Sequence, residues 1–191
     1  FFRPFVGGIT LDESLGTSAA IFKFIWSMLS KGIATLPAGG MQSIPAAMAS
    51  ALKKKNVDIL LDTQVTGLTK NSNHWNVRTP TDFIESEIVV LATDAWSLGG
   101  LIPEYSPPKY RSQRCLWLTL DRVVDCGPSL ILNPDRQSPF MTVAPMHAVD
   151  PDRAPKGKSL FAVTVRADHF MDTTDEIVQS FHQAMQRNKV I

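Results

Sequence analysis

The sequence is poor in the residues that most often mark a reactive or metal-binding site. Its two cysteines, Cys115 and Cys126, are too few for a disulfide framework or a zinc site, and we expect both to be buried thiols, the usual state of free cysteine. The four histidines are scattered without the spacing of metal ligands; they are His74, His147, His169 and His182. We therefore expect surface or partly buried histidines and no metal.

The chain also lacks an excess of either charge. It has 19 basic and 18 acidic residues, a net charge of +1, which provides no field to attract nucleic acid. The one dense basic run, 53–55, falls at the end of a predicted helix, where positive charge meets the negative pole of the helix. We expect no nucleic-acid partner.

Long apolar runs are missing as well. The longest, Ala19 to Leu29, contains Lys23 and is too short to span a bilayer, and no secretory signal is present. The chain starts without methionine and ends after a helix-like segment, so we expect both ends to be cut from a longer protein. The sequence contains no signal that identifies a compartment, and we expect a cytoplasmic or membrane-peripheral location.

Catalytic motifs are absent too. There is no G-x-S-x-G elbow, no P-loop, no paired-cysteine motif and no G-x-G-x-x-G fingerprint. No acid or base can be tied to a substrate, so the catalytic residues are unknown and the sequence leaves open whether the chain is an enzyme.

What is present is a regular alternation of helix and strand patterns. An apolar stripe from Ile21 to Leu29 predicts a helix capped by Thr17 or Ser18 and ended by Gly32. Because Phe22 and Trp26 lie off the stripe, we expect the helix to be covered on more than one side. It is either a core helix or the wall of an apolar ligand cavity.

Two further helices and one turn are predicted. One helix starts near Ser43 and runs to about Lys55, and the other spans Glu176 to Arg187 with its cap in 172–175. The apolar face of the last helix consists of Ile177, Phe181 and Met185. Residues 1–8 read as an apolar segment closed by a turn at its two glycines.

The strand patterns predict a small antiparallel meander and a separate sheet. The meander comprises 63–68, 74–79 and 83–87, preceded by a strand at 57–61 and followed by a buried strand at 88–92, judged by its continuous apolar run. After a proline-rich linker near 103–108 come strands at 111–120, 129–132, 140–144 and 159–167. The expected fold class is α+β, with helices on a mixed or antiparallel sheet.

We expect three parts along the chain. Residues 1–56 form the helical part of a substrate-binding region, 57–100 a meander and central strand of a cofactor domain, and 101–191 the antiparallel sheet and helix of the substrate-binding domain. These functional labels rest on the resemblance that follows.

The order of elements resembles the FAD-dependent amine oxidase superfamily. The resemblance rests on Leu36-Pro37-Ala38-Gly39-Gly40-Met41, on the helix that follows, and on the pattern Val57-x-Ile59-x-Leu61-x-Thr63-x-Val65-x-x-Leu68. The opening Phe2-Arg3-Pro4-Phe5-x-Gly7-Gly8 is most similar to protoporphyrinogen-oxidase-like and phytoene-desaturase-like members. The resemblance covers about residues 1–96 well, and beyond them only the pattern of strands followed by a helix agrees.

The resemblance implies FAD as cofactor and a small apolar or amine substrate from which hydride is removed. It implies that Val65 contacts the FAD adenine through its backbone amide and carbonyl. It also implies that Ala92 and Thr93 approach the cofactor at a strand end, where open α/β sheets bind ligands. Ala34 and Leu36 would lie near the substrate cavity.

Two family segments have no counterpart here: the amino-terminal glycine fingerprint and the carboxy-terminal Gly-Asp segment that completes the flavin site. We therefore expect a central fragment that is inactive alone, does not retain FAD, and has the missing segments of the same chain as partners. Two alternatives stay open. One is a non-catalytic module that binds an apolar ligand, and the other is an interaction fragment that dimerises to hide an apolar patch.

Overall fold

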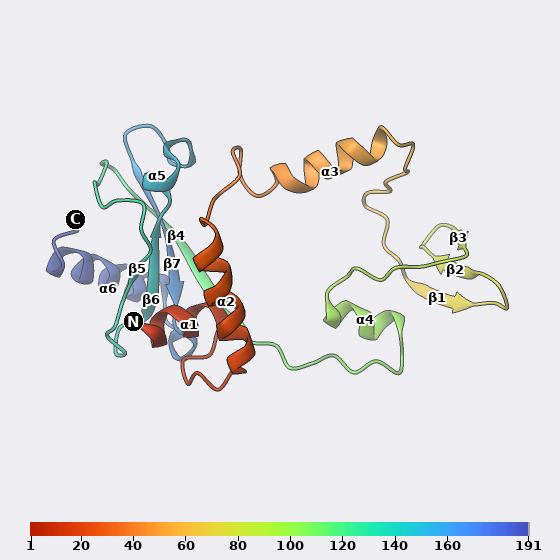
Figure 1. The fold of residues 1–191 in the computed structure, drawn as a ribbon, viewed down its shortest axis with the longest axis horizontal. Helices are drawn as coiled ribbons and strands as arrows, with labels where there is room; N and C mark the ends of the chain where they lie inside the picture. Colours follow the sequence, from red (N-terminus) through yellow and green to blue (C-terminus); the bar gives the residue numbers. More distant parts are fainter. Residues whose placement is uncertain (191) are drawn as a thin grey trace. The chain divides into compact units, whose positions relative to one another are not determined.

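Four antiparallel strands and one long helix build the main core of the protein. A computed structural model describes residues 1–190 and divides them into two units. The first unit joins Phe1–Leu36 to the chain from Arg111 onward, and the second is the intervening Pro37–Tyr110. Figure 1 shows the elements of both.

Helices and antiparallel sheets occur in both units, so the predicted α+β class is confirmed. In the first unit the elements are α1 Phe2–Thr10, α2 Ala19–Lys31, β4 Arg114–Leu120, β5 Ile131–Leu132, β6 Phe140–Pro145, α5 Met146–Val149, β7 Ser159–Val165 and α6 Thr174–Arg187, with short 3-10 turns at Pro151–Arg153 and Ala167–His169. In the second they are α3 Ser43–Lys53, β1 Gly67–Lys70, β2 Trp75–Arg78, β3 Phe83–Ser86 and α4 Ala95–Leu101.

The sheet of the first unit has the order β4-β7-β6-β5, and one of its faces is packed against α6. Residues of β7 alternate, so that Phe161 and Val163 are fully buried against the helix. From α6 the predicted face, Ile177, Phe181 and Met185, is buried, and the rings of Phe161 and Phe181 lie 5.7 Å apart. Both the helix and its apolar face were predicted, and both are confirmed.

A capping box starts α6. The Thr173 hydroxyl accepts a hydrogen bond from the Glu176 amide at 3.3 Å, and the Glu176 carboxylate accepts one from the Thr173 amide at 2.8 Å. The bond from the Thr173 amide, and after it one that the Thr173 hydroxyl donates to the same carboxylate at 2.8 Å, hold the pKa of Glu176 below its ordinary value of 4.5. The carboxylate therefore stays charged at neutral pH.

Arg166, at the end of β7, is buried and binds to two loops. Its Nε donates to the Ser138 carbonyl at 3.0 Å, and its Nη2 donates to the carbonyls of Asn133 and Asp135 at 3.0 and 2.9 Å. Its Nη1 forms an ion pair with Glu13 from the loop between α1 and α2. The guanidinium thus joins the β5–β6 loop to the amino-terminal helices.

The neighbouring Asp12 organises the same α1–α2 loop. Its carboxylate accepts bonds from the Ser14 amide and hydroxyl and from the Thr17 hydroxyl, and it forms an ion pair with Arg111 at 3.1 Å. The Ser14 hydroxyl bond is the main cause that lowers the pKa of Asp12, with Thr17 and Arg111 adding to it. Arg111 is the residue at which the chain re-enters the first unit.

The segment at Gly7 and Gly8 is helical, so the predicted turn is wrong. Both glycines lie inside α1. A Cβ on Gly7 would stand 3.1 Å from the Cα of Glu13, and one on Gly8 would stand 3.6 Å from the Met141 side chain. Close packing on the following loop and on β6, rather than a left-handed conformation, explains glycine here.

The second unit consists of the predicted meander, α3 and α4. Strands β1, β2 and β3 pair antiparallel in sequence order, which confirms the strands expected at 74–79 and 83–87. Thr79 is the one buried residue among 37–110, and every buried apolar side chain of residues 1–190 lies in the first unit. The second unit therefore has no apolar core of its own.

The prediction of strands at 57–61 and 88–92 is wrong. Neither segment joins a ladder within residues 1–190, and no residue of the expected buried strand is buried; Ile88 is 78% and Val90 82% exposed. A strand needs a neighbour to take its backbone hydrogen bonds. The described chain supplies none beside these runs.

Two smaller expectations also fail. Cys115 is exposed and Cys126 half-buried, because Cys115 lies on the face of edge strand β4 that points away from α6. Helix α2 has no buried residue instead of being covered on several sides, and its capping by Ser18 is confirmed. None of the described helices is long and apolar enough to cross a membrane.

We expect Glu13→Gln to lower the free energy of unfolding of the first unit by about 3 kcal/mol, because it leaves the buried Arg166 guanidinium without its counter-charge. Chemical denaturation measures this. Asp168→Asn, an exposed acid with no ion pair among the described residues, is the matched control and should change stability little. Equal losses of unfolding free energy in the two variants would show that the ion pair of Glu13 with Arg166 does not stabilise the first unit.

The capping box predicts a pH dependence. Because the folded state holds the pKa of Glu176 below 4.5, its contribution to stability is complete above that pH and is lost as the pH falls through the lowered value. We expect Glu176→Gln to flatten this part of the acid side of the stability curve, measured by thermal unfolding between neutral and acid pH. An unchanged acid slope would contradict the assignment.

Candidate functional site

A hollow of about 700 Å³ in the second unit brings together two of the residues singled out from the sequence. Val65 and Thr93 both line it, although 28 positions in the sequence separate them. The chain entering β1 forms one wall, and α4 with the residue Thr93 before it forms the other. The complete lining is Thr63, Gln64, Val65, Thr66, Thr93, Ser97, Gly100 and Leu101.

Asp94 sets the position of the α4 wall. Its Oδ1 accepts bonds from the amides of Trp96 and Ser97 at 2.9 and 3.0 Å, and its Oδ2 accepts one from the Ser97 hydroxyl at 2.7 Å. Ser97 and Gly100, three positions apart, share one side of the helix, and both line the hollow. The cap therefore decides which residues of α4 face the site.

The hollow has hydroxyl and amide groups but no charged side chain in its lining. The Ser97 hydroxyl, followed by the backbone bonds, lowers the pKa of Asp94, so this neighbouring carboxylate stays ionised and occupied by its own helix amides. Those amides are then not free to bind a phosphate. The hollow suits an uncharged polar group better than an anion.

Val65 lines this hollow and has free main-chain groups. The ladder of β1 and β2 is preceded by a bond from the Thr66 amide to the Arg78 carbonyl at 2.8 Å, and Val65 lies one residue before it. Among residues 1–190, neither the N–H nor the C=O of Val65 has a hydrogen-bond partner. One donor and one acceptor of the same residue are thus free at the rim of the hollow.

The other predicted site residues do not line this hollow. Ala92 is exposed and adjoins Thr93 without belonging to the lining. Ala34 and Leu36 are exposed in the extended segment after α2, in the first unit. Ser97 and Gly100 were missed by sequence reasoning; the spacing of Asp94 and Ser97, a helix cap and the third residue after it, was the available signal.

The first unit has hollows of its own. One, of about 360 Å³, lies between α1 and α2 and is mainly apolar, with Phe2, Val6 and Phe22 in its wall. Another, of about 430 Å³, adjoins Arg166 and Glu13 and is also lined by Arg136 and Asp168. Arg166 and Glu13 are already paired, which leaves the exposed Arg136 and Asp168 as the remaining charges in this wall.

The chemistry of proton transfer is not assembled at the Val65 hollow. Its lining contains no histidine, cysteine or acid, and within residues 1–190 no group of three or more His, Cys, Asp or Glu side chains is placed to hold a metal ion. Of the histidines, His147 is buried, with its ring nitrogens against the backbone of Leu160 and Val124 at 3.1 and 2.9 Å, so it supports the fold. The arrangement at the hollow can bind a ligand but supplies no acid or base.

Comparison with known proteins identifies the fold and the family of this chain. A solved structure from Exiguobacterium sp. 255-15, described as "Putative protoporphyrinogen oxidase", has the same fold with a TM-score of 0.57 and 13% identity. The likeness covers 78% of this chain and 35% of that one, so the chain spans about a third of the length of this relative. A search of curated proteins found no match. The profile of the family described as "Flavin containing amine oxidoreductase" matches residues 1–187, and the chain therefore belongs to the flavin-containing amine oxidoreductase family.

Proposed function

We propose that this chain is a central part of an FAD-dependent oxidoreductase and that the Val65 hollow takes the adenosine end of the cofactor. The observation that carries the proposal is the free N–H and C=O of Val65 at the rim of an uncharged hollow. Membership of a flavin-containing family supports a flavin as the ligand.

The hydrogen-bond pattern fits adenine. An adenine ring offers an amino group that donates and ring nitrogens that accept, side by side on one edge. A single residue with free amide and carbonyl groups can pair with such an edge without any special side chain. This explains how a plain valine can serve as a cofactor contact.

The surrounding hydroxyls fit the ribose. Thr66, Thr93 and Ser97 line the hollow, and their hydroxyls, each of which donates to a neighbouring oxygen, can still accept a bond from a ribose hydroxyl. Ala92, next to Thr93, is small and leaves room at the rim. The pyrophosphate does not fit this lining, because no basic side chain or free helix terminus is there; on this proposal other segments of the full-length protein would hold it.

The reaction that we propose is removal of hydride from an amine or an apolar carbon substrate. The flavin supplies that chemistry when bound, and the protein supplies position, dryness and electrostatics. In this chain the residues around Val65 would orient the cofactor. Ala34 and Leu36, exposed beside α2, would contribute to an apolar wall for the substrate.

Other segments of the same protein are proposed as the partners of this chain. The two apolar runs 57–61 and 88–92 are largely exposed and join no sheet among the described residues, as expected of strands whose neighbours are supplied elsewhere. Continuous apolar runs are typical of strands buried on both faces of a parallel sheet. On this view the isolated chain would neither retain FAD nor turn over substrate.

A binding module without redox function is the second candidate. The apolar hollow between α1 and α2, with Phe2 and Phe22 in its wall, favours it. Such a module would hold an apolar ligand in the first unit and would need no flavin.

Val65 provides a sharp test of the cofactor contact. In the full-length protein we expect Val65→Pro, which removes the amide donor, to weaken FAD binding about tenfold, the value of one lost hydrogen bond. Val65→Ala keeps the amide and should bind FAD as the parent does. Titration of the apoprotein with FAD measures both, with circular dichroism as the check on folding. Equal weakening by both variants would assign the effect to the side chain and sink the backbone contact.

The absorption spectrum of the full-length protein separates the two functions. We expect visible flavin bands that bleach when a reducing amine or apolar substrate is added without oxygen. A colourless protein that takes up no added FAD would contradict the oxidoreductase and favour the apolar-ligand module. A flavin that binds but is reduced by neither class of substrate would leave the cofactor assignment standing and overturn the proposed reaction.

A further inference from the structure

Helix α2 has two chemically distinct sides. Placed at about 100° per residue, its apolar residues form one continuous arc, in the order Phe24, Met28, Ile21, Ile25, Leu29, Phe22 and Trp26. The rest of the circumference carries only alanine, serine and lysine. This is the pattern of an amphipathic helix with a wide apolar side.

Most of the apolar side is not covered within the first unit. Phe22 and Trp26 lie against Phe2 of α1, with ring centroids 6.0 and 6.3 Å apart. The remainder of the arc is open, and Phe24 is 65% exposed and Met28 48%. Phe1 and Phe2 on α1 add exposed aromatic surface to the same pair of helices.

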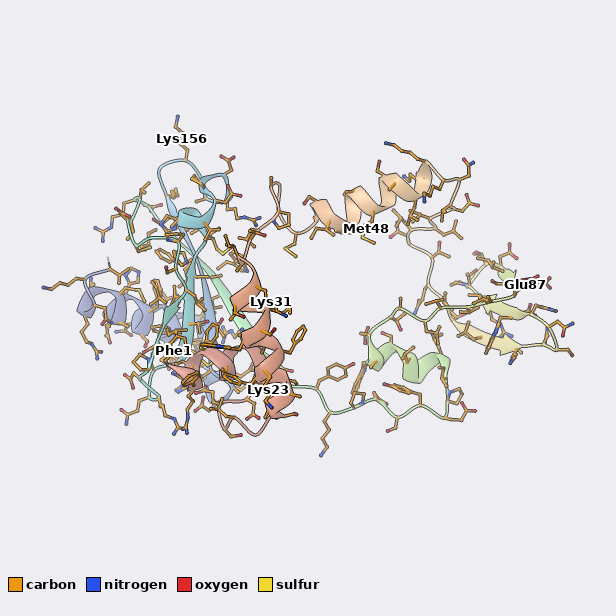
Figure 2. The ribbon with its side chains drawn as sticks, viewed as in Figure 1. Phe1, Lys23, Lys31, Met48, Glu87 and Lys156 are labelled. Carbon is orange, nitrogen blue, oxygen red and sulfur yellow. The ribbon has the colours of Figure 1, made fainter. Side chains whose placement is uncertain are left out.

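The charges of this region have a single sign. Helices α1 and α2 carry no aspartate or glutamate, and the two acids of the loop between them, Asp12 and Glu13, are already paired with arginines. The only charged residues of α2 are Lys23 and Lys31, near its two ends (Figure 2). Both lie outside the apolar arc, and Trp26 lies where that arc meets the polar side.

We propose that α2 lies on an anionic lipid surface, with its open apolar arc among the acyl chains and its two lysines at the headgroup phosphates. Interfacial helices combine Phe, Leu and Trp on one side with lysine on the other, and tryptophan favours the boundary between the two. The apolar arc alone would also match an uncharged hydrophobic partner. Because the charged residues of α2 are both lysines, an anionic lipid surface is favoured over such a partner. This inference does not depend on the bound flavin.

The test uses the full-length protein and sedimentation with vesicles. Binding is expected to vesicles of phosphatidylglycerol and phosphatidylcholine in equal parts, to weaken with added salt, and to be much lower with phosphatidylcholine alone. Quenching of tryptophan fluorescence by brominated lipid, compared with Trp26→Phe, reports whether this helix is the part that enters the bilayer.

Variants with matched controls separate the contribution of the lysines to vesicle binding from that of the apolar side chains. We expect Lys23→Gln with Lys31→Gln to lower the affinity about 30-fold, because each lysine near an anionic surface contributes about fivefold. Phe24→Ser should lower it by at least about tenfold through lost apolar burial. The controls are Lys156→Gln and Met171→Ser, an exposed lysine and an 88% exposed methionine elsewhere in the unit, and both should bind as the parent does.

Three results would overturn the proposal. The first is failure of the parent protein to bind the anionic vesicles. The second is strong loss of thermal stability in Phe24→Ser without vesicles, which would mean that another part of the same chain covers the arc. The third is concentration-dependent self-association that Phe24→Ser abolishes, which would assign the arc to a second copy. None of the three bears on FAD uptake, so the oxidoreductase assignment is tested separately.

Discussion

The packing of α6 against one face of the four-stranded sheet is the interaction on which the structure depends. Every buried apolar side chain among residues 1–190 lies in the unit that contains this contact, and the fully buried phenylalanines are Phe140, Phe161 and Phe181. Burying such a side chain stabilises a fold by about 2 kcal/mol, whereas the surface ion pairs contribute less. The Arg166 and Asp12 contacts act on this core by fixing the loops around it.

The second unit shows what happens when this kind of burial is missing. Its meander satisfies backbone groups by pairing, but its apolar runs 57–61 and 88–92 find neither a neighbouring strand nor a covering layer in the described chain. The same deficiency leaves the backbone of Val65 free. The lack of an apolar core in this unit therefore goes together with backbone groups that are free for the proposed contacts with a cofactor and with other segments.

The two units divide the proposed functions between them. The uncharged hollow near Val65 and Asp94 belongs wholly to the second unit. The apolar helix α2 and the hollow beside it belong to the first. Cofactor binding and contact with a lipid surface can thus be altered independently by mutation, because no residue is shared between them.

The sequence by itself determined helices α3 and α6, strands β2 and β3 of the meander and the apolar face of α6, because these depend on local periodicity and on side chains that cap nearby amides. It placed the first meander strand at 63–68, whereas β1 is Gly67–Lys70. Its motif order also indicated the family. Only the tertiary structure decided that Gly7 and Gly8 stay helical, that Cys115 is exposed, and that Ser97 and Gly100 meet Val65 in one hollow. It also decided that the run at 88–92 is not buried. These outcomes depend on which surfaces touch and on whether a neighbouring strand is present, and a one-dimensional pattern contains neither.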